Sequence, residues 1–244
     1  MSLFKSVLSF IGAAIFFAVS GLHFFGLVPF QLNCDVAYRY EKDWGNLQSY
    51  FHSNFQSSQV DVSVNEVVFM GDSITEQLNL KMFFPNKTYL NKGIWGQTTP
   101  EMLLRFRSDV INHRPKVVVI LGGINDLAKL NESQPIEGIF GNIKSMAELA
   151  LVNNIQVIIA SLLPVCGQVA NQRSPSDILK VNRLLFEYAS KSGMIYLDYF
   201  AAVVGKNGHL RAELSTDCLR MNKAGYKIMA PLAEASIQKL RKLI

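Results

Sequence analysis

The stretch Glu66–Thr75, EVVFMGDSIT, joins a short apolar run to a glycine and then to a polar turn. The run Glu66–Met70 is apolar and rich in β-branched residues, which is typical of a buried strand. Gly71 permits a tight turn directly after it. Ser73 then stands where a helix should begin, with unpaired backbone N–H groups behind it. Such a serine is more often an N-cap than a nucleophile, although a catalytic serine needs the same position.

Strands and helices alternate from this stretch to the end of the chain. Further strands are expected at Thr88–Ile94, Lys116–Leu121, Gln156–Pro164 and Met194–Phe200. Apolar residues at helical spacing occupy the intervals Glu101–Asn112, Pro135–Asn153, Pro175–Ser192 and Lys223–Leu243. Buried strands that alternate with helices predict a parallel sheet covered on both faces. The predicted fold class is therefore α/β, a three-layer α/β/α sandwich with a parallel sheet of about five strands.

Ligands of such sheets bind beyond the carboxyl ends of the strands, so the residues that follow each strand are candidates for a site. Gly93 and Gly96 follow the second strand. Either glycine could form a simple turn, or could bring a backbone N–H close to a substrate oxygen. Asn125 follows the third strand and has a side-chain amide able to donate to an oxyanion. Asp126 beside it could cap the next turn.

Three motifs, in this order at the ends of successive strands, resemble the sequence blocks of a known family: GDSIT, NKGIWGQTT and LGGINDL. The family is that of the SGNH (GDSL-type) hydrolases, which are esterases and lipases with a flavodoxin-like sheet. The resemblance extends from about Val67 to the C-terminus. It implies that Ser73 is the nucleophile and that its N–H, the Gly96 N–H and the Asn125 amide form an oxyanion hole. It implies no cofactor.

The final block of the family reads Asp-x-x-His, and the similar stretch here is DCLRMNKAGY, from Asp217 to Tyr226. Asn222 and Gly225 are also in register, but Arg220 occupies the histidine position. A serine hydroxyl needs a base to accept its proton, and imidazole suits this role because its pKa lies near 6.5. Arginine stays protonated and has no acceptor, so we expect it to pair with Asp217 instead.

Of the four histidines in the sequence, only one is a candidate to replace the missing base. His113 precedes the third strand and is expected at the opposite edge of the sheet, whereas His23 and His52 lie in the N-terminal segments. His209 is the candidate substitute base because its loop leads to Asp217, although a loop histidine is more often solvated. The four histidines lack paired ligand spacing, so no metal site is predicted.

These residues support two functions. The first is ester hydrolysis by Ser73, slowed by the missing base, in which Asp72, Arg173 and Arg220 contact the substrate and Arg220 holds an anionic group. The second is a pseudoenzyme that binds an acyl, lipid or acetylated-glycan ligand without turnover. A third interpretation leaves Arg220 and Asp217 as a salt bridge in an inactive pocket, with the membrane anchor as the functional part.

The N-terminal segment differs from the rest of the chain in composition. The segment Ser6–Gln31 contains no Asp, Glu, Lys or Arg. It is long enough for a membrane-spanning helix and longer than the apolar core of a cleavable signal peptide. We therefore predict an uncleaved anchor over residues 1–31, with cleavage near Ala18-Val19-Ser20 and secretion, or a buried soluble helix, as alternatives. Leu32-Asn33-Cys34 resembles a lipoprotein box only loosely. Lys5 predicts that the domain lies outside the cytoplasm, on the periplasmic or extracellular side.

Residues 32–63 are predicted as a juxtamembrane linker or helix, and residues 64–244 as the hydrolase-like domain. The composition, 49% hydrophobic and 18% charged, is that of a globular chain. The net charge of +5 is scattered, so no nucleic-acid partner is expected. The three cysteines make no disulfide framework. A Cys166–Cys218 bridge can form outside the cytoplasm, but unpaired buried thiols are the expectation. The sequence does not predict an oligomeric state.

Overall fold

The computed structural model describes residues 43–50, 66–128 and 135–242. The chain divides into two compact units, Met1–Trp44 and Gly45–Ile244, and the second contains the whole sheet. The anchor predicted over residues 1–31 lies outside the described residues, as does most of the predicted linker 32–63. Among the residues that the structure describes, no helix combines the length and apolar character needed to cross a membrane.

A parallel sheet of five strands, in the order β2-β1-β3-β4-β5, forms the centre of the second unit. The strands are β1 (Val67–Gly71), β2 (Tyr89–Gly93), β3 (Val117–Leu121), β4 (Gln156–Ala160) and β5 (Ile195–Leu197). Every residue of β1 and β3 is buried, as expected for central strands covered on both faces. The predicted α/β fold with a parallel sheet of about five strands is confirmed.

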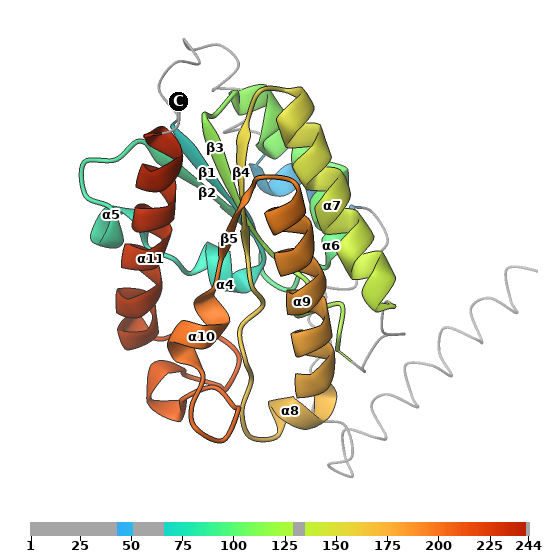
Figure 1. Cartoon of the computed structure of the whole chain (residues 1–244), viewed down its shortest axis with the longest axis vertical. Helices are drawn as coiled ribbons and strands as arrows, with labels where there is room; N and C mark the ends of the chain where they lie inside the picture. The colour runs from blue at the N-terminus through green and yellow to red at the C-terminus, as the bar shows by residue number, and fades with distance from the viewer. Residues whose placement is uncertain (1–42, 51–65, 129–134, 243–244) are drawn as a thin grey trace, which may run out of the picture. The chain divides into compact units, whose positions relative to one another are not determined.

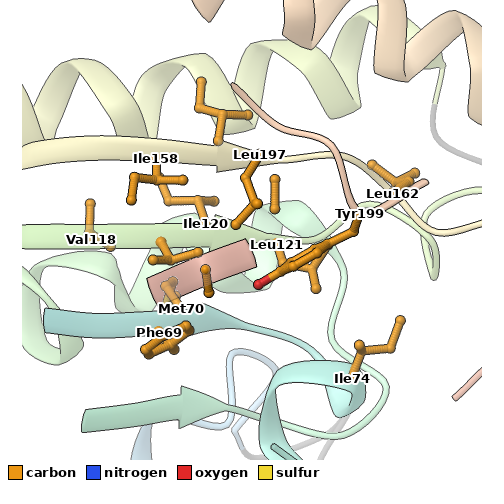
Figure 2. Packing of buried hydrophobic residues seen from close by; sticks show 14 of the residues in the cluster. Phe69, Met70, Ile74, Val118, Ile120, Leu121, Ile158, Leu162, Leu197 and Tyr199 are labelled. Atoms are coloured by element: carbon orange, nitrogen blue, oxygen red, sulfur yellow. The ribbon is translucent and has the colours of Figure 1, made fainter. Parts of the chain in front are cut away.

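Helices cover both faces of this sheet (Figure 1). On one face, α6 (Thr99–Asp109), α7 (Ile136–Val152) and α9 (Pro175–Lys191) pack side by side. On the other face lies α11 (Lys223–Arg241), which contacts α5 (Leu80–Phe83) and α10 (Tyr199–Val203). Figure 2 shows apolar side chains of the strands in the core, among them Met70, Ile120 and Ile158. The sheet and its helices therefore form the three predicted layers.

The fourth and fifth predicted strands run several residues past the C-terminal ends of the observed ones. The fourth ends at Ala160, because the backbone N–H and carbonyl of Leu162 pair with the Asn182 side chain at 2.7 and 2.9 Å instead of with a neighbouring strand. The fifth ends at Leu197, because Asp198 caps α10. Short elements were not predicted, since a single turn carries no apolar period. They are α5, α8 (Val169–Gln172), α10 and the 3₁₀ helices η1 (Leu47–Tyr50), η3 (Ile111–His113) and η4 (Ala212–Leu214).

Cys166 and Cys218 form a disulfide, so the expectation of unpaired thiols is wrong. The bridge joins the loop after β4 to the loop before α11, and the backbone N–H of Cys166 donates to the carbonyl of Cys218 at 3.1 Å. The two Cα atoms lie 4.7 Å apart, within the range that a disulfide requires. The fold brings the two loops together across 52 residues of sequence, and cysteine count alone carries no signal for that contact.

Candidate active site

Ser73 lies at the carboxyl end of β1, as the first residue of the short helix α4 (Ser73–Glu76). Asp72, not Ser73, is the N-cap residue, and its Oδ1 accepts the Ile74 N–H at 2.8 Å. An N-cap role therefore does not explain why a serine stands at position 73. Ser73 is 4% exposed, and within the described part of the chain its hydroxyl makes no hydrogen bond.

The C-terminal block contacts this turn directly. Tyr226 donates its hydroxyl to the carbonyl of Ile74 at 2.6 Å, in a buried contact that spans 152 residues of sequence. Asn222 caps α11, because its Oδ1 accepts the N–H groups of Ala224 and Gly225. The structure thus brings the end of the stretch 217–226 onto the helix that carries Ser73.

Close packing of α4 on β2 fixes the turn from the other side. A Cβ atom at Gly93 would lie 2.1 Å from the backbone nitrogen of Glu76, so only glycine permits this approach. The side chain of Asn91 donates to the Thr75 carbonyl at 2.6 Å and accepts the Gly93 N–H at 2.8 Å. The N–H of Gly93 is therefore used within the protein, which leaves Gly96 as the better candidate for a donor to a ligand.

Residues 94–98, the 94–98 loop, follow β2 and lie against residues 71–75, the Ser73 turn. The Ile94 N–H donates to the Gly71 carbonyl at 3.1 Å. Gly96 has a φ of +73°, a left-handed conformation that favours glycine. The side-chain amide of Asn125 donates to the Gln97 carbonyl at 2.9 Å. The amide of Asn125 thus lies against the loop that contains Gly96, and that loop is bonded to the end of β1.

Arg220 is bound to Asp217 through both its side chain and its backbone. Its Nε and Nη2 each lie 2.7 Å from Asp217 Oδ2, and its N–H donates to Oδ1 at 2.8 Å. This is the ion pair expected from the sequence. Burial acts to raise the pKa of Asp217, but the hydrogen bonds from Arg220 and Leu219 outweigh it and hold the pKa below its ordinary value. The guanidinium of Arg220 is therefore already paired with a carboxylate.

His209 contacts a different part of the protein. Its Nδ1 lies 3.3 Å from the Val165 carbonyl, and among the described residues no hydrogen bond joins it to Ser73. His113 is buried in η3, and burial, with the Lys92 charge, lowers its pKa to about 4. In the ranges that the structure describes, no group of three or more His, Cys, Asp or Glu side chains is placed to hold a metal.

Two buried carboxylates accompany the Ser73 turn. Asp72 is fully buried, and its Oδ2 has no hydrogen-bond partner. Burial raises the pKa of Asp72 to about 7, against the hydrogen bond from Ile74, and the Asp126 charge raises it further. Asp126 accepts both the N–H and the hydroxyl of Thr99, at 3.0 and 2.5 Å, and burial raises its pKa to about 6. The charge of the site therefore changes near neutral pH.

Arg173 brings a second guanidinium to the same edge of the sheet. Its Nε donates at 3.1 Å to the carbonyl of Ile124, next to Asn125 in the loop after β3. Burial lowers the pKa of Arg173, whereas the charges of Asp72 and Asp217 raise it. The guanidinium thus interacts with the carboxylates of both the Ser73 turn and the Asp217 loop.

Arg105 is a site residue that the sequence analysis missed. It is 1% exposed in α6, and its Nη2 donates to the Gly71 carbonyl at 3.0 Å. Its Nε donates to Gln97 Oε1 at 2.5 Å, and its Nη1 lies 2.6 Å from Asp109 Oδ2. A buried cation therefore contacts both the Ser73 turn and the 94–98 loop. Its position in the helix could have predicted its burial, because Arg105 lies on the same buried face of α6 as Phe106.

The chain is similar to known proteins both in sequence and in fold. Residues 69–228 match the model of the GDSL-like Lipase/Acylhydrolase family. A GDSL-like lipase of Bacteroides thetaiotaomicron is 36% identical, with a TM-score of 0.75 over 81% of this chain and 100% of its own. A Bacteroides fragilis protein assigned as an acylhydrolase is 37% identical, with a TM-score of 0.76 over 82% of this chain and 99% of its own.

Two further relatives are more distant or shorter in extent. An acetylxylan esterase of Geobacillus stearothermophilus shares the fold at 20% identity, with a TM-score of 0.59 over 70% of this chain and 93% of its own. The uncharacterised lipoprotein YqeF of Bacillus subtilis is 48% identical over 50 residues. That match spans only 20% of this chain and 21% of the lipoprotein.

Proposed function

The chain belongs to the GDSL-like lipase/acylhydrolase family, and from this premise we propose that it is a serine ester hydrolase slowed by its missing histidine. Ser73 is the nucleophile in this proposal. Its N–H, the Gly96 N–H and the Asn125 amide stabilise the oxyanion. One observation carries the proposal: the Ser73 hydroxyl has no hydrogen-bonded base in the described residues, while the Asn125 amide lies against the adjacent 94–98 loop.

The reaction proceeds in two steps. Ser73 Oγ attacks the carbonyl carbon, the bond to the alcohol breaks to leave an acyl-serine, and water then releases the acid. The Oγ proton passes to water or hydroxide, because Arg220 has no acceptor atom. Serine hydrolases that lack a triad member keep a ~10³–10⁴-fold rate enhancement from the oxyanion hole and binding. We therefore expect slow turnover that depends on Ser73.

Arg173 and Arg220 are proposed to contact the substrate, whereas Asp72, expected beside them from the sequence, is fully buried and is left out of this contact. The charge of Arg220 is offset by Asp217, and Asp72 is only partly ionised near pH 7. The guanidinium of Arg173 is proposed to attract an anionic group of the ester. The substrate class is otherwise that of the family resemblance: a small ester, a lipid or an acetylated glycan.

The ion pair between Arg220 and Asp217 also supports a second candidate, a protein that binds such a ligand without turnover. In that case the guanidinium holds the ligand, and Ser73 is never activated. Both candidates use the same residues, so only the reactivity of Ser73 separates them.

A serine-reactive fluorophosphonate probe measures that reactivity. A hydrolase should be labelled at Ser73 and should hydrolyse p-nitrophenyl acetate, and Ser73→Ala should lose both signals. Ser236→Ala is a matched control because Ser236 lies in α11, where its hydroxyl bonds the Leu232 carbonyl. Absence of label and of hydrolysis in the folded wild-type protein would refute the hydrolase and leave the binding protein.

We further propose that the domain works outside the cytoplasm and is held at the membrane through residues 1–31. Three observations support this: the uncharged stretch Ser6–Gln31, the Cys166–Cys218 disulfide, which is typical of oxidising compartments, and the similarity to a lipoprotein. Membrane fractionation with N-terminal sequencing tests it. A membrane-bound chain that begins near Met1 supports the anchor, a released chain that begins after Ser20 supports a cleaved signal, and an acylated Cys34 supports a lipoprotein.

A further inference from the structure

We propose that Arg105 and the segment Gly45–Tyr50 position the 94–98 loop for oxyanion stabilisation. The inference rests on the proposed function, in which the Gly96 N–H is an oxyanion donor. It gives a role to a segment that precedes the family match at residues 69–228. Arg105 and the segment are positioning elements, since neither is proposed to touch the substrate.

Gln97 connects these elements to the loop. It is fully buried, and its Oε1 accepts from Arg105 Nε at 2.5 Å while its Nε2 donates to the Gly45 carbonyl at 2.9 Å. Its backbone carbonyl accepts from Asn125 Nδ2 at 2.9 Å. Three separate segments therefore fix Gln97, and Gly96 is the residue directly before it.

Arg105 extends the same network to the Ser73 turn. Its Nη2 donates at 3.0 Å to the carbonyl of Gly71, two residues before Ser73. Its partner Asp109 is also buried, with the side chains of the pair 1% and 3% exposed. Desolvation of a guanidinium is costly, and the hydrogen bonds to the carboxylate and to two oxygens offset it. The rigid planar group fixes the separation of the two segments, which a lysine cannot do.

Tyr50 holds the other end of the loop. Its hydroxyl donates to the Gly93 carbonyl at 2.7 Å, at the residue where β2 ends and the loop begins. The buried Lys92 places its Nζ 4.3 Å from the centroid of the Tyr50 ring, a cation–π geometry. The segment Gly45–Tyr50 thus bonds the backbone of β2 through Tyr50 and the side chain of Gln97 through Gly45.

Oxyanion donors lower the barrier only if they are fixed before the reaction begins. An element that fixes them acts in the transition state more than in the ground state. Loosening the loop should therefore lower kcat and leave KM nearly unchanged. A segment with a purely structural role would lower the melting temperature without this change in kcat.

Two mild variants of the full-length protein test the proposal. Tyr50→Phe removes one hydrogen bond, and Gln97→Glu keeps an acceptor for Arg105 but places an oxygen against the Gly45 carbonyl. We expect kcat for p-nitrophenyl acetate to fall about 3–10-fold and about 10–100-fold respectively, less than the ~10²–10³-fold of losing an oxyanion donor. The control is Tyr89→Phe, which removes a 2.8 Å bond to Glu234 from the opposite end of β2 and should leave kcat unchanged.

Amide hydrogen exchange over residues 93–98 gives a readout that does not need turnover. Exchange should be faster in Tyr50→Phe and Gln97→Glu and unchanged in Tyr89→Phe. Wild-type kcat and wild-type exchange in both folded variants would overturn the positioning role. If the wild-type protein shows no Ser73-dependent hydrolysis, the proposed function fails instead, and exchange decides alone: faster exchange supports the positioning role and unchanged exchange overturns it.

Discussion

Replacing Arg220 with histidine should raise the rate of the proposed serine hydrolase. The guanidinium now occupies Asp217 Oδ2 through two contacts of 2.7 Å. Without it, Oδ2 can accept the Nδ1–H of an imidazole, as the aspartate of a triad does. Asp217 Oδ1 keeps its bonds from the backbone N–H groups of Leu219 and residue 220, at 3.2 and 2.8 Å. The orientation of the carboxylate therefore does not depend on the arginine side chain.

The expected gain in kcat is about 10²–10⁴-fold, the usual contribution of general acid–base catalysis. That gain corresponds to about 3–5 kcal/mol of activation free energy. The substitution should cost little stability, because the Arg220 and Asp217 side chains are 31% and 32% exposed. Ion pairs with this exposure contribute about 0–1 kcal/mol. The variant should stay folded, so a change in kcat reports on proton transfer.

Initial rates of p-nitrophenyl acetate hydrolysis across the pH range measure the effect. The wild-type rate should keep rising with pH, because hydroxide or water accepts the Ser73 proton. Arg220→His should instead reach a plateau above a pKa near 6.5, the ordinary value of imidazole. Asp217 stays ionised throughout that range, since its pKa lies below the ordinary value.

Matched variants separate the possible causes of a gain. Ser73→Ala in the Arg220→His background should abolish the new activity, and Arg220→Gln should remove the cation without supplying a base. Two results would refute the reasoning. If the wild-type protein already shows a fast rate with a plateau near neutral pH, a base is present, and His209→Ala identifies or excludes that histidine. If Arg220→Gln gains as much as Arg220→His, the guanidinium obstructs the site and the missing base is not limiting.

Stability measurements test three other features. Burial raises the pKa of Asp72 from 3.8 to about 7, so the wild-type protein loses stability as the pH rises through that window. Asp72→Asn should therefore leave the free energy of unfolding, measured with urea, unchanged at pH 3 and raise it by about 2–4 kcal/mol at pH 8. Equal effects at both pH values would contradict this. Serine at both Cys166 and Cys218 should cost about 3–4 kcal/mol, because the bridge closes a span of 52 residues; a reductant should lower the wild-type melting temperature to the same level. Tyr226→Phe should cost about 1–3 kcal/mol by leaving the buried Ile74 carbonyl without its donor, and an unchanged unfolding free energy would show that the bond is not needed.

The core of the fold could be predicted because its strands are buried on both faces. β1 and β3 are continuous apolar runs, and such runs, alternating with helical segments, are typical of the central strands of a parallel sheet. The contacts between the Ser73 turn and the 94–98 loop could be anticipated for a related reason. Parallel strands end at one edge, so residues that follow neighbouring strands meet there. The bond from Ile94 to the carbonyl of Gly71 shows that meeting.

Arg105 could not be predicted in the same way. With Asp109 it forms a pair four residues apart, which on most helices is a solvent-exposed ion pair. Here the pair shares the buried face of α6 with Met102 and Phe106. Such a pair can be buried only where oxygen atoms accept the hydrogen bonds of the guanidinium, and here the acceptors are the Gly71 carbonyl and Gln97 Oε1. Local sequence holds no information about those partners, and for the same reason it could not decide between the Cys166–Cys218 bridge and unpaired thiols.

In the proposed hydrolase, the arginine at position 220 removes the proton acceptor but leaves the supporting contacts of the site in place. The supports of the Asp217 loop are present: Asp217 Oδ1 is held by backbone N–H groups, Cys218 is bonded to Cys166, and Tyr226 reaches the Ser73 helix. The 94–98 loop is held independently, through Gln97 and Arg105. Oxyanion stabilisation therefore depends on parts of the molecule that do not involve residue 220. In the proposed mechanism, the site lacks a single proton acceptor rather than the architecture of a triad, so one substitution should be enough to restore the missing step.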